Sequence, residues 1–154
     1  MNHEELDVLS RKVMSAAYIV HSAMGPGLLE SAYIACLVFE LQKAGLEVKT
    51  EVPVPLVYEN VKLADVGYRL DLLVENELIV EVKAREALAP VHFAQLVSYL
   101  KLANRRLGLL INFHVASLKD RIHRRVNNFL ILNAMCAMFL AMYAMPFECG
   151  SPPC

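Results

Sequence analysis

Residues 68–84 read YRLDLLVENELIVEVKA, and this stretch decides the fold. Apolar residues recur on both sides of a polar centre, which predicts two antiparallel strands over residues 68–74 and 78–84. If a three-residue turn is centred on Asn76, paired residues have numbers that sum to 152. Asp71 is then directly opposite Glu81, with the two Cβ atoms roughly 4.5–5.5 Å apart.

The two faces of this hairpin differ in chemistry. One face is apolar throughout and is predicted to be the core face; it consists of Leu70, Leu72, Val74, Leu78, Val80 and Val82. The other face carries Asp71, Leu73, Ile79, Glu81 and Lys83. Lys83 follows Glu81 by two residues, so both side chains point to the same side. The apolar residues near the turn indicate that this second face is also partly covered.

Two carboxylates this close repel each other, and a divalent cation between them relieves the repulsion. Hard cations prefer oxygen ligands, so Asp71 and Glu81 are candidate ligands for Mg²⁺ or Mn²⁺, with the carbonyl of Val82 as a further oxygen. Lys83 would position an attacking water or stabilise negative charge on a phosphate. The alternative is an exposed cross-strand ladder of ion pairs.

The remaining elements are predicted from apolar periodicity and from turn residues. Helices are expected over residues 4–23, 28–44 and 90–104, with a short basic helix over 118–127. Strands are expected over residues 46–52, 54–58 and 107–113. Pro53 and Pro55 restrict their segment to an edge or an irregular strand. Glu59-Asn60 is a predicted turn.

Two helices add polar residues at helical spacing. His92, Gln95 and Tyr99 share one stripe, which suits contact with a metal-bound water or a phosphate; the alternative is a solvent face. Glu30 and Tyr33 share a face of the second helix. Taken alone, Glu30 is a first-turn glutamate favoured by the helix dipole, and Tyr33 is a core or rim aromatic.

These motifs together resemble a known family. Asp71 followed by Glu81-Val82-Lys83 resembles the D…(D/E)-x-K signature of the PD-(D/E)XK nuclease superfamily, with Leu70 in place of the usual proline. Gln95-x-x-x-Tyr99 resembles the Q-x-x-x-Y element of one branch of that superfamily. Gly27-x-x-Glu30-x-x-Tyr33 is similar to the motif of the bacterial GxxExxY family, as are residues 90–96 and 107–113. The resemblance covers residues 4–128.

The resemblance implies an α/β domain over residues 1–128, with a mixed central sheet flanked by helices. It implies that Asp71 and Glu81 bind the metal and that Lys83 is the catalytic lysine. It also implies a magnesium-dependent nuclease that hydrolyses DNA or RNA. A non-catalytic module that binds nucleic acid or protein on the same fold is the alternative.

The same resemblance assigns supporting roles. Glu30 would be an additional acidic residue that contacts a metal-bound water, and Gln95 and Tyr99 would support substrate or water. Further candidate substrate contacts are Tyr33, His92, Lys101, Arg105 and Arg106.

Charge and composition limit the function further. The net charge of −1 gives no global attraction to nucleic acid, so phosphate contacts must come from local basic residues. Those residues gather late in the chain as Lys101, Arg105, Arg106, Lys119, Arg121, Arg124 and Arg125; the alternative is that they solubilise helix ends. No G-x-x-x-x-G-K phosphate loop is present, which argues against ATP-driven work.

Residues 129–154 are expected to form an apolar C-terminal extension with an additional helix. Residues 129–145 contain no charged side chain and, at 17 residues, reach the lower limit for spanning a bilayer. Three hypotheses remain open: a membrane anchor, a helix that packs on the domain or on the copy in a homodimer, and an extension outside the family pattern.

The cysteines and the N-terminus predict the compartment. Cys36, Cys136, Cys149 and Cys154 form no C-x-x-C pair, and their spacing does not match the tight cluster expected of iron–sulfur nucleases. The acidic N-terminus lacks the apolar segment of a signal peptide. A cytoplasmic protein is therefore expected, or one anchored through its tail.

Overall fold

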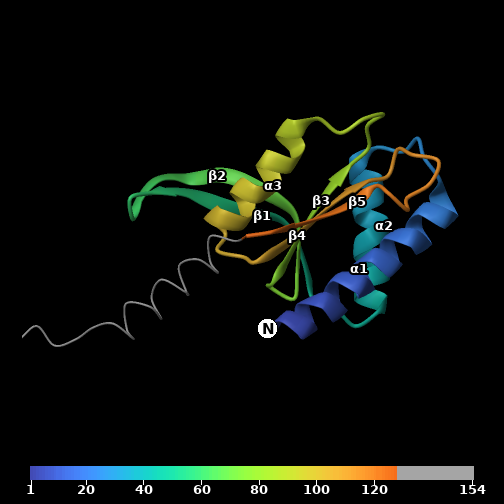
Figure 1. Ribbon diagram of the computed structural model, residues 1–154, viewed down its shortest axis with the longest axis horizontal. Coiled ribbons are helices and arrows are strands. Elements are labelled where there is room, and N and C mark those ends of the chain that lie inside the picture. The colour runs from blue at the N-terminus through green and yellow to red at the C-terminus, as the bar shows by residue number, and fades with distance from the viewer. Residues whose placement is uncertain (128–154) are drawn as a thin grey trace, which may run out of the picture.

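The computed structural model describes residues 1–127 (Figure 1). Its helices are α1 (His3–Met24), α2 (Glu30–Lys43) and α3 (Pro90–Leu102). Its strands are β1 (Val48–Tyr58), β2 (Val61–Val74), β3 (Leu78–Lys83), β4 (Leu107–Asn112) and β5 (Ile122–Val126). They form a sheet in the order β1-β2-β3-β4-β5, in which β3 and β4 are parallel and the other neighbours antiparallel. The prediction of a mixed sheet flanked by helices is confirmed.

The helices α1 and α2 are separated by a glycine-containing turn. The side chain of Asn2 caps α1 by accepting the amide of Glu5, whose carboxylate in turn accepts the amide of Asn2. The helix stops at Gly25, whose φ of 62° favours glycine. The second helix begins at Glu30, two residues later than predicted, because Leu29 has an extended backbone.

The β1–β2 hairpin is long and extends beyond α3 (Figure 1). Its tip is a two-residue turn at Glu59 and Asn60, both with positive φ, as the mirror-image hairpin turns require. Prolines are tolerated in β1 because it is an edge strand, as Pro53 and Pro55 predict.

The register between β2 and β3 agrees with the prediction. The paired residues are Leu72 with Val80, Leu73 with Ile79 and Val74 with Leu78, and each pair sums to 152. Regular pairing reaches Leu72 and does not include Asp71, the residue that precedes it. The site therefore lies where the two strands begin to part.

One residue of the predicted core face lies on the other side. Leu70 packs with the residues under α3 and not with Leu72, so the alternation of faces along β2 breaks between them. Glu51 of β1 lies between Thr50 and Val52, which pair with Leu72 and Leu70, and it has a φ of 49°. The switch therefore occurs where the backbone of β1 is irregular and the pairing with β2 skips one position.

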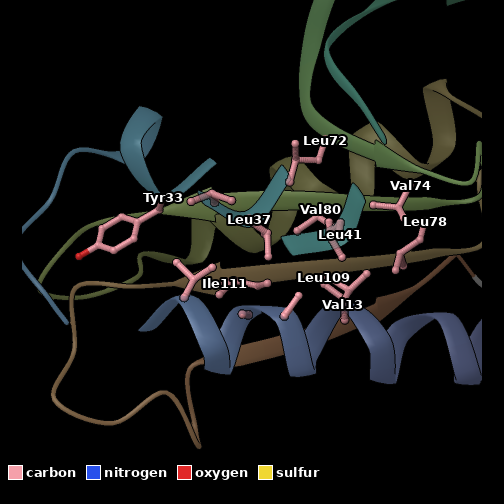
Figure 2. Close-up of a cluster of buried hydrophobic side chains, with 14 of the residues drawn as sticks. Val13, Tyr33, Leu37, Leu41, Leu72, Val74, Leu78, Val80, Leu109 and Ile111 are labelled. Carbon is pink, nitrogen blue, oxygen red and sulfur yellow. The ribbon is translucent and has the colours of Figure 1, made fainter. Parts of the chain in front are cut away.

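The sheet carries a core on each face. On one face, α1 and α2 cover a large cluster that includes Val13, Leu37, Leu41, Val80 and Leu109 (Figure 2). On the other face, α3 covers a smaller cluster, called here the α3 core. It consists of Val54, Leu70, Leu73, Ile79, Leu96, Tyr99, Leu100 and Leu110. The second face of the hairpin is thus partly covered, as its apolar residues predict.

The predicted basic helix over residues 118–127 is wrong, because this segment contains β5. The strand pairs antiparallel with β4, from Leu107 opposite Val126 to Ile111 opposite Ile122. It satisfies backbone groups that β4 would otherwise expose at the edge of the sheet. The basic residues that suggested a helix are tolerated because β5 is itself an edge strand.

In residues 1–127, no helix is long and apolar enough to cross a membrane. The hypotheses for residues 129–154, including the C-terminal helix, lie outside the described residues.

A substitution at Gly108 tests how closely α3 packs on β4. A Cβ atom at this position would lie 2.7 Å from Cδ1 of Leu96, which is fully buried and cannot move aside freely. Gly108→Ala is expected to destabilise the fold by about 1–3 kcal/mol, measured by urea unfolding. The cost should shrink in a Leu96→Ala background, and exposed Ser98→Ala serves as the control. Equal costs in both backgrounds would contradict the close packing.

Candidate active site

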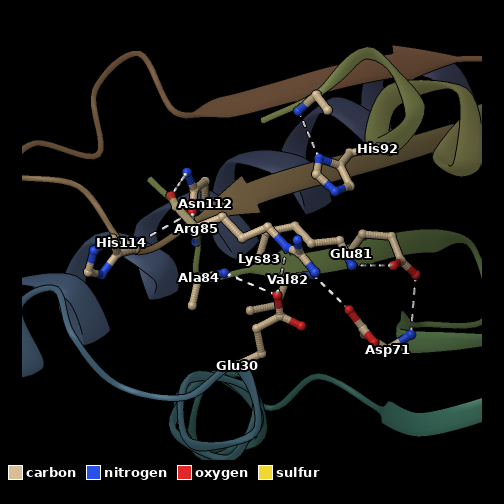
Figure 3. Close-up of polar contacts among 11 residues, drawn as sticks. Glu30, Asp71, Glu81, Val82, Lys83, Ala84, Arg85, His92, Asn112 and His114 are labelled. Atoms are coloured by element: carbon tan, nitrogen blue, oxygen red, sulfur yellow. Dashed lines mark hydrogen bonds and ion pairs between the residues drawn. The ribbon is translucent and has the colours of Figure 1, made fainter. Parts of the chain in front are cut away.

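The carboxylates of Asp71 and Glu81 each accept a hydrogen bond from a backbone amide of the neighbouring strand (Figure 3). The amide of Asp71 donates to Oε1 of Glu81 at 3.3 Å, and the amide of Val82 donates to Oδ2 of Asp71 at 2.9 Å. These contacts replace regular strand pairing just beyond Leu72. The two carboxylates predicted to be neighbours are therefore brought together.

Burial makes the pair electrostatically unfavourable when both groups are ionised. Glu81 is almost fully buried, and this burial, followed by the negative charge of Asp71, raises its pKa to about 8. Burial also raises the pKa of Asp71, against the hydrogen bond from Val82. Without a cation, Glu81 consequently holds a proton at neutral pH.

Lys83 lies beside this pair. Its Nζ is 3.7 Å from Oε2 of Glu81, and its side chain is only 13% exposed. The contact differs from the surface ion-pair ladder because the partner is buried. An ammonium group in this position faces the same space as the carboxylates.

Glu30 approaches from the first turn of α2. Its Oε1 accepts the amide of Ala84 at 3.3 Å and lies 4.0 Å from Nε of Arg85 (Figure 3). Its charge also contributes to the raised pKa of Asp71. The structure thus brings Glu30 to the end of β3, next to Lys83.

Asn112 is a site residue that the sequence analysis missed. This fully buried residue pairs with Lys83 across the parallel strands. Its Oδ1 accepts the amide of Arg85 at 3.0 Å, and its Nδ2 donates to the carbonyl of Arg85 at 2.7 Å. It therefore fixes the chain just after Lys83. The signal in the sequence was a lone amide at the end of the apolar run 107–113.

The predicted stripe of His92, Gln95 and Tyr99 on α3 lies partly on the side of the site. Nε2 of Gln95 donates to the hydroxyl of Tyr99 at 2.5 Å. Tyr99 packs in the α3 core with Leu70 and Ile79, and burial, then the charge of Glu81, raises the pKa of its hydroxyl. His92 accepts the amide of Ala89 through Nδ1 and helps to begin the helix.

The second ring nitrogen of His92 is not used in that cap. Burial lowers the pKa of His92, and the positive charges of Arg85 and Lys83 lower it further. The imidazole is therefore close to the end of β3, at the outer rim of the site (Figure 3).

Tyr33 does not reach a surface from which it could contact substrate. It is fully buried and stacks on Phe113 with ring centroids 4.6 Å apart. Its hydroxyl donates to the carbonyl of Gly25 at 2.6 Å and accepts the amide of Leu28 at 3.1 Å. The residue thus fixes the turn that precedes Glu30 and supports the site only indirectly.

Three basic candidates lie at the other end of the sheet. Lys101 lies in the last turn of α3, and Arg105 and Arg106 follow the helix just before Leu107, which pairs with Leu78. Lys83 lies five residues beyond Leu78 along β3, roughly 16 Å from it. Arg106 also donates to the carbonyl of Met1. The structure does not bring these side chains together with the carboxylates.

The donor set fits a small divalent ion held by few protein ligands. Within residues 1–127, no group of three or more His, Cys, Asp or Glu side chains is arranged to hold a metal. Mg²⁺ commonly uses only one or two carboxylates and keeps several waters. The buried pair of Asp71 and Glu81 meets that requirement, and a cation would remove the repulsion that raises the pKa of Glu81.

Comparison with known proteins identifies one family. A family model described as the PD-(D/E)XK nuclease superfamily matches residues 7–126. Neither the curated proteins nor the solved structures give a significant match.

The raised pKa of Glu81 predicts an unusual pH dependence of stability in EDTA. The folded state keeps this proton up to about pH 8, whereas the unfolded state releases it near its ordinary pKa of 4.5. Between these values the folded state binds more protons, so the free energy of unfolding should fall as pH rises, by at most about 1.4 kcal/mol per pH unit. Urea unfolding between these pH limits measures the slope.

Glu81→Gln should flatten that slope, while exposed Glu59→Gln should leave it unchanged. Mg²⁺ should stabilise the wild type at pH 8 more than Glu81→Gln, because it binds the ionised pair. Parallel pH profiles for wild type and Glu81→Gln would show that Glu81 is not the group responsible.

Proposed function

The chain belongs to the PD-(D/E)XK nuclease superfamily, and we propose that it is a divalent-metal-dependent nuclease that hydrolyses phosphodiester bonds of DNA or RNA. One observation carries the proposal: a buried pair of carboxylates, Asp71 and Glu81, shares its space with the ammonium of Lys83. A structural ion-pair ladder on a sheet surface has no reason to be buried, because burial costs more than the pairing returns.

The metal would be held by one carboxylate from each strand. Asp71 comes from β2 and Glu81 from β3, where the two strands part. The carbonyl of Val82 supports a third oxygen ligand, since its amide already points toward Asp71 and both groups of an extended residue face the same side. Mg²⁺ or Mn²⁺ bound there would supply charge neutralisation and an acidic water.

Lys83 would act on the phosphate or on the attacking water. Its ammonium is held near Glu81 by the short strand β3, whose end is fixed by Asn112 through Arg85. A positive charge placed in advance costs no reorganisation when negative charge develops on the phosphate. Lys83 is therefore proposed as the catalytic lysine.

The neighbouring side chains would bind water and substrate. Glu30 lies beyond Lys83, where it would accept a hydrogen bond from a metal-bound water. Gln95 donates to the hydroxyl of Tyr99, and this hydroxyl would in turn donate to a water or a phosphate oxygen. His92 and Arg85, on the rim, would contact the adjoining phosphate.

Incubation with labelled single- and double-stranded DNA and RNA tests the function. Cleavage should require Mg²⁺ or Mn²⁺ and should stop in EDTA. Lys83→Ala and Asp71→Ala should each lower the rate at least about 100-fold, because each removes a group that stabilises the transition state. Time courses on denaturing gels measure the rate.

Lys12→Ala, on the exposed surface of α1, is the matched control and should cleave like the wild type. Circular dichroism and urea unfolding verify that each variant is folded. If the wild type and these variants do not differ on any substrate, the nuclease proposal is wrong. Metal-independent binding without cleavage would instead identify a non-catalytic binding module.

A further inference from the structure

Tyr68 is an exposed aromatic residue on the same side of the sheet as the site. It pairs with Val54 across β1 and β2, and Val54 is buried in the α3 core. Opposite residues in an antiparallel pair share a face, so Tyr68 also lies on the α3 side. Its side chain nevertheless remains 43% exposed. The ring thus has one side against the protein and another toward solvent.

The inner side of the ring faces Tyr99. The two ring centroids are 5.4 Å apart and the planes are inclined by 52°. Tyr99 in turn packs in the α3 core with Leu70, which adjoins Asp71, and with Ile79, two residues before Glu81. Tyr68 therefore lies against the helix that covers the side of the sheet carrying the carboxylate pair.

The distance along the strand is also short. Tyr68 precedes Asp71 by three residues, or about 10 Å of extended chain. A stacked nucleic-acid strand advances about 3.4 Å per nucleotide, so this span corresponds to no more than about three nucleotides. A strand whose phosphate lies at Asp71 can therefore place a nearby base on Tyr68.

We infer that Tyr68 is a stacking residue for a nucleotide base and that the substrate is consequently single-stranded or locally unpaired nucleic acid. This inference rests on the proposed nuclease function. Inside a duplex, both faces of each base are already covered by its neighbours, so a protein ring can stack only on a base that has left the helix or lies at its end. Stacking tolerates any base, because every base has an aromatic face.

The distribution of charge agrees with this mode of binding. Arg105 and Arg106 precede Leu107, which pairs with Leu78, and Leu78 lies roughly 16 Å from Lys83 along β3. Two cations at the end of β3, Lys83 and Arg85, are themselves close to Glu81 and Glu30. These carboxylates partly cancel the attraction of Lys83 and Arg85 for a phosphate. Contact between Tyr68 and a base would add affinity that does not depend on charge.

The competing explanation is that Tyr68 only shields Tyr99 from water. Leucine distinguishes the two roles, because it keeps apolar bulk against Tyr99 but has no aromatic face. Phenylalanine keeps the face and loses only the hydroxyl. The variants Tyr68→Leu and Tyr68→Phe therefore separate stacking from shielding.

Binding is measured by fluorescence anisotropy with short labelled single strands and duplexes of the same sequence. Ca²⁺ replaces Mg²⁺, since it binds the same oxygen ligands with looser geometry. Tyr68→Ala and Tyr68→Leu should weaken single-strand binding about tenfold, with little change on duplex, and Tyr68→Phe should bind like the wild type. Tyr18→Ala, 42% exposed on α1, is the matched control and should change nothing.

The outcomes separate this inference from the proposed function. Wild-type binding to duplex as tight as to single strand, or unaltered binding by Tyr68→Leu, overturns the stacking role even if the protein cleaves. Binding that depends on Tyr68, without metal-dependent cleavage, supports stacking and overturns the nuclease. Parallel DNA and RNA strands show which sugar the site accepts.

Discussion

Parallel pairing of β3 with β4 requires the chain to cross one face of the sheet, and α3 makes this crossing above Asp71 and Glu81. The helix brings its own apolar residues onto that face and removes water from the carboxylates. The raised pKa of Glu81 is the electrostatic result. The carboxylates of Asp71 and Glu81 are thus partly shielded from water because the connection from β3 to β4 runs over them.

The crossing segment begins just after Lys83, at the end of β3. Its backbone must be held in place there if Lys83 is to keep its position. Asn112 holds both backbone groups of Arg85, and the carboxylate of Glu30 accepts the amide of Ala84. These side chains supply backbone hydrogen bonds beyond the point where regular strand pairing ends. Tyr33 contributes one step further away, since it fixes the turn before Glu30. The charged residues are therefore positioned by polar contacts at the end of β3 and by packing elsewhere.

The sheet has two chemically different ends. The ends of β3 and β4 that carry Lys83 and Asn112 hold the acids and the lysine, whereas the opposite ends lie near Arg105 and Arg106. Between them, Tyr99 of α3 packs in the α3 core and accepts a hydrogen bond from Gln95. The long hairpin carries Tyr68 beside this helix. A strand of nucleic acid at the acids would accordingly lie between the hairpin and the start of α3.

The sequence by itself determined the hairpin register, the mixed sheet implied by the family resemblance, and the neighbouring positions of Asp71, Glu81 and Lys83. The register and the neighbouring positions depend on alternation and turn length, which are local and can be read from the chain. The mixed sheet was predicted from the family resemblance alone. Only the tertiary structure decided that residues 122–126 form a strand, because the open edge of β4 outweighs local helical preference. It also decided that Leu70 changes face, that Tyr33 is buried and that Asn112 anchors the end of β3. Each of these depends on contacts between segments far apart in the sequence, which periodicity cannot reveal.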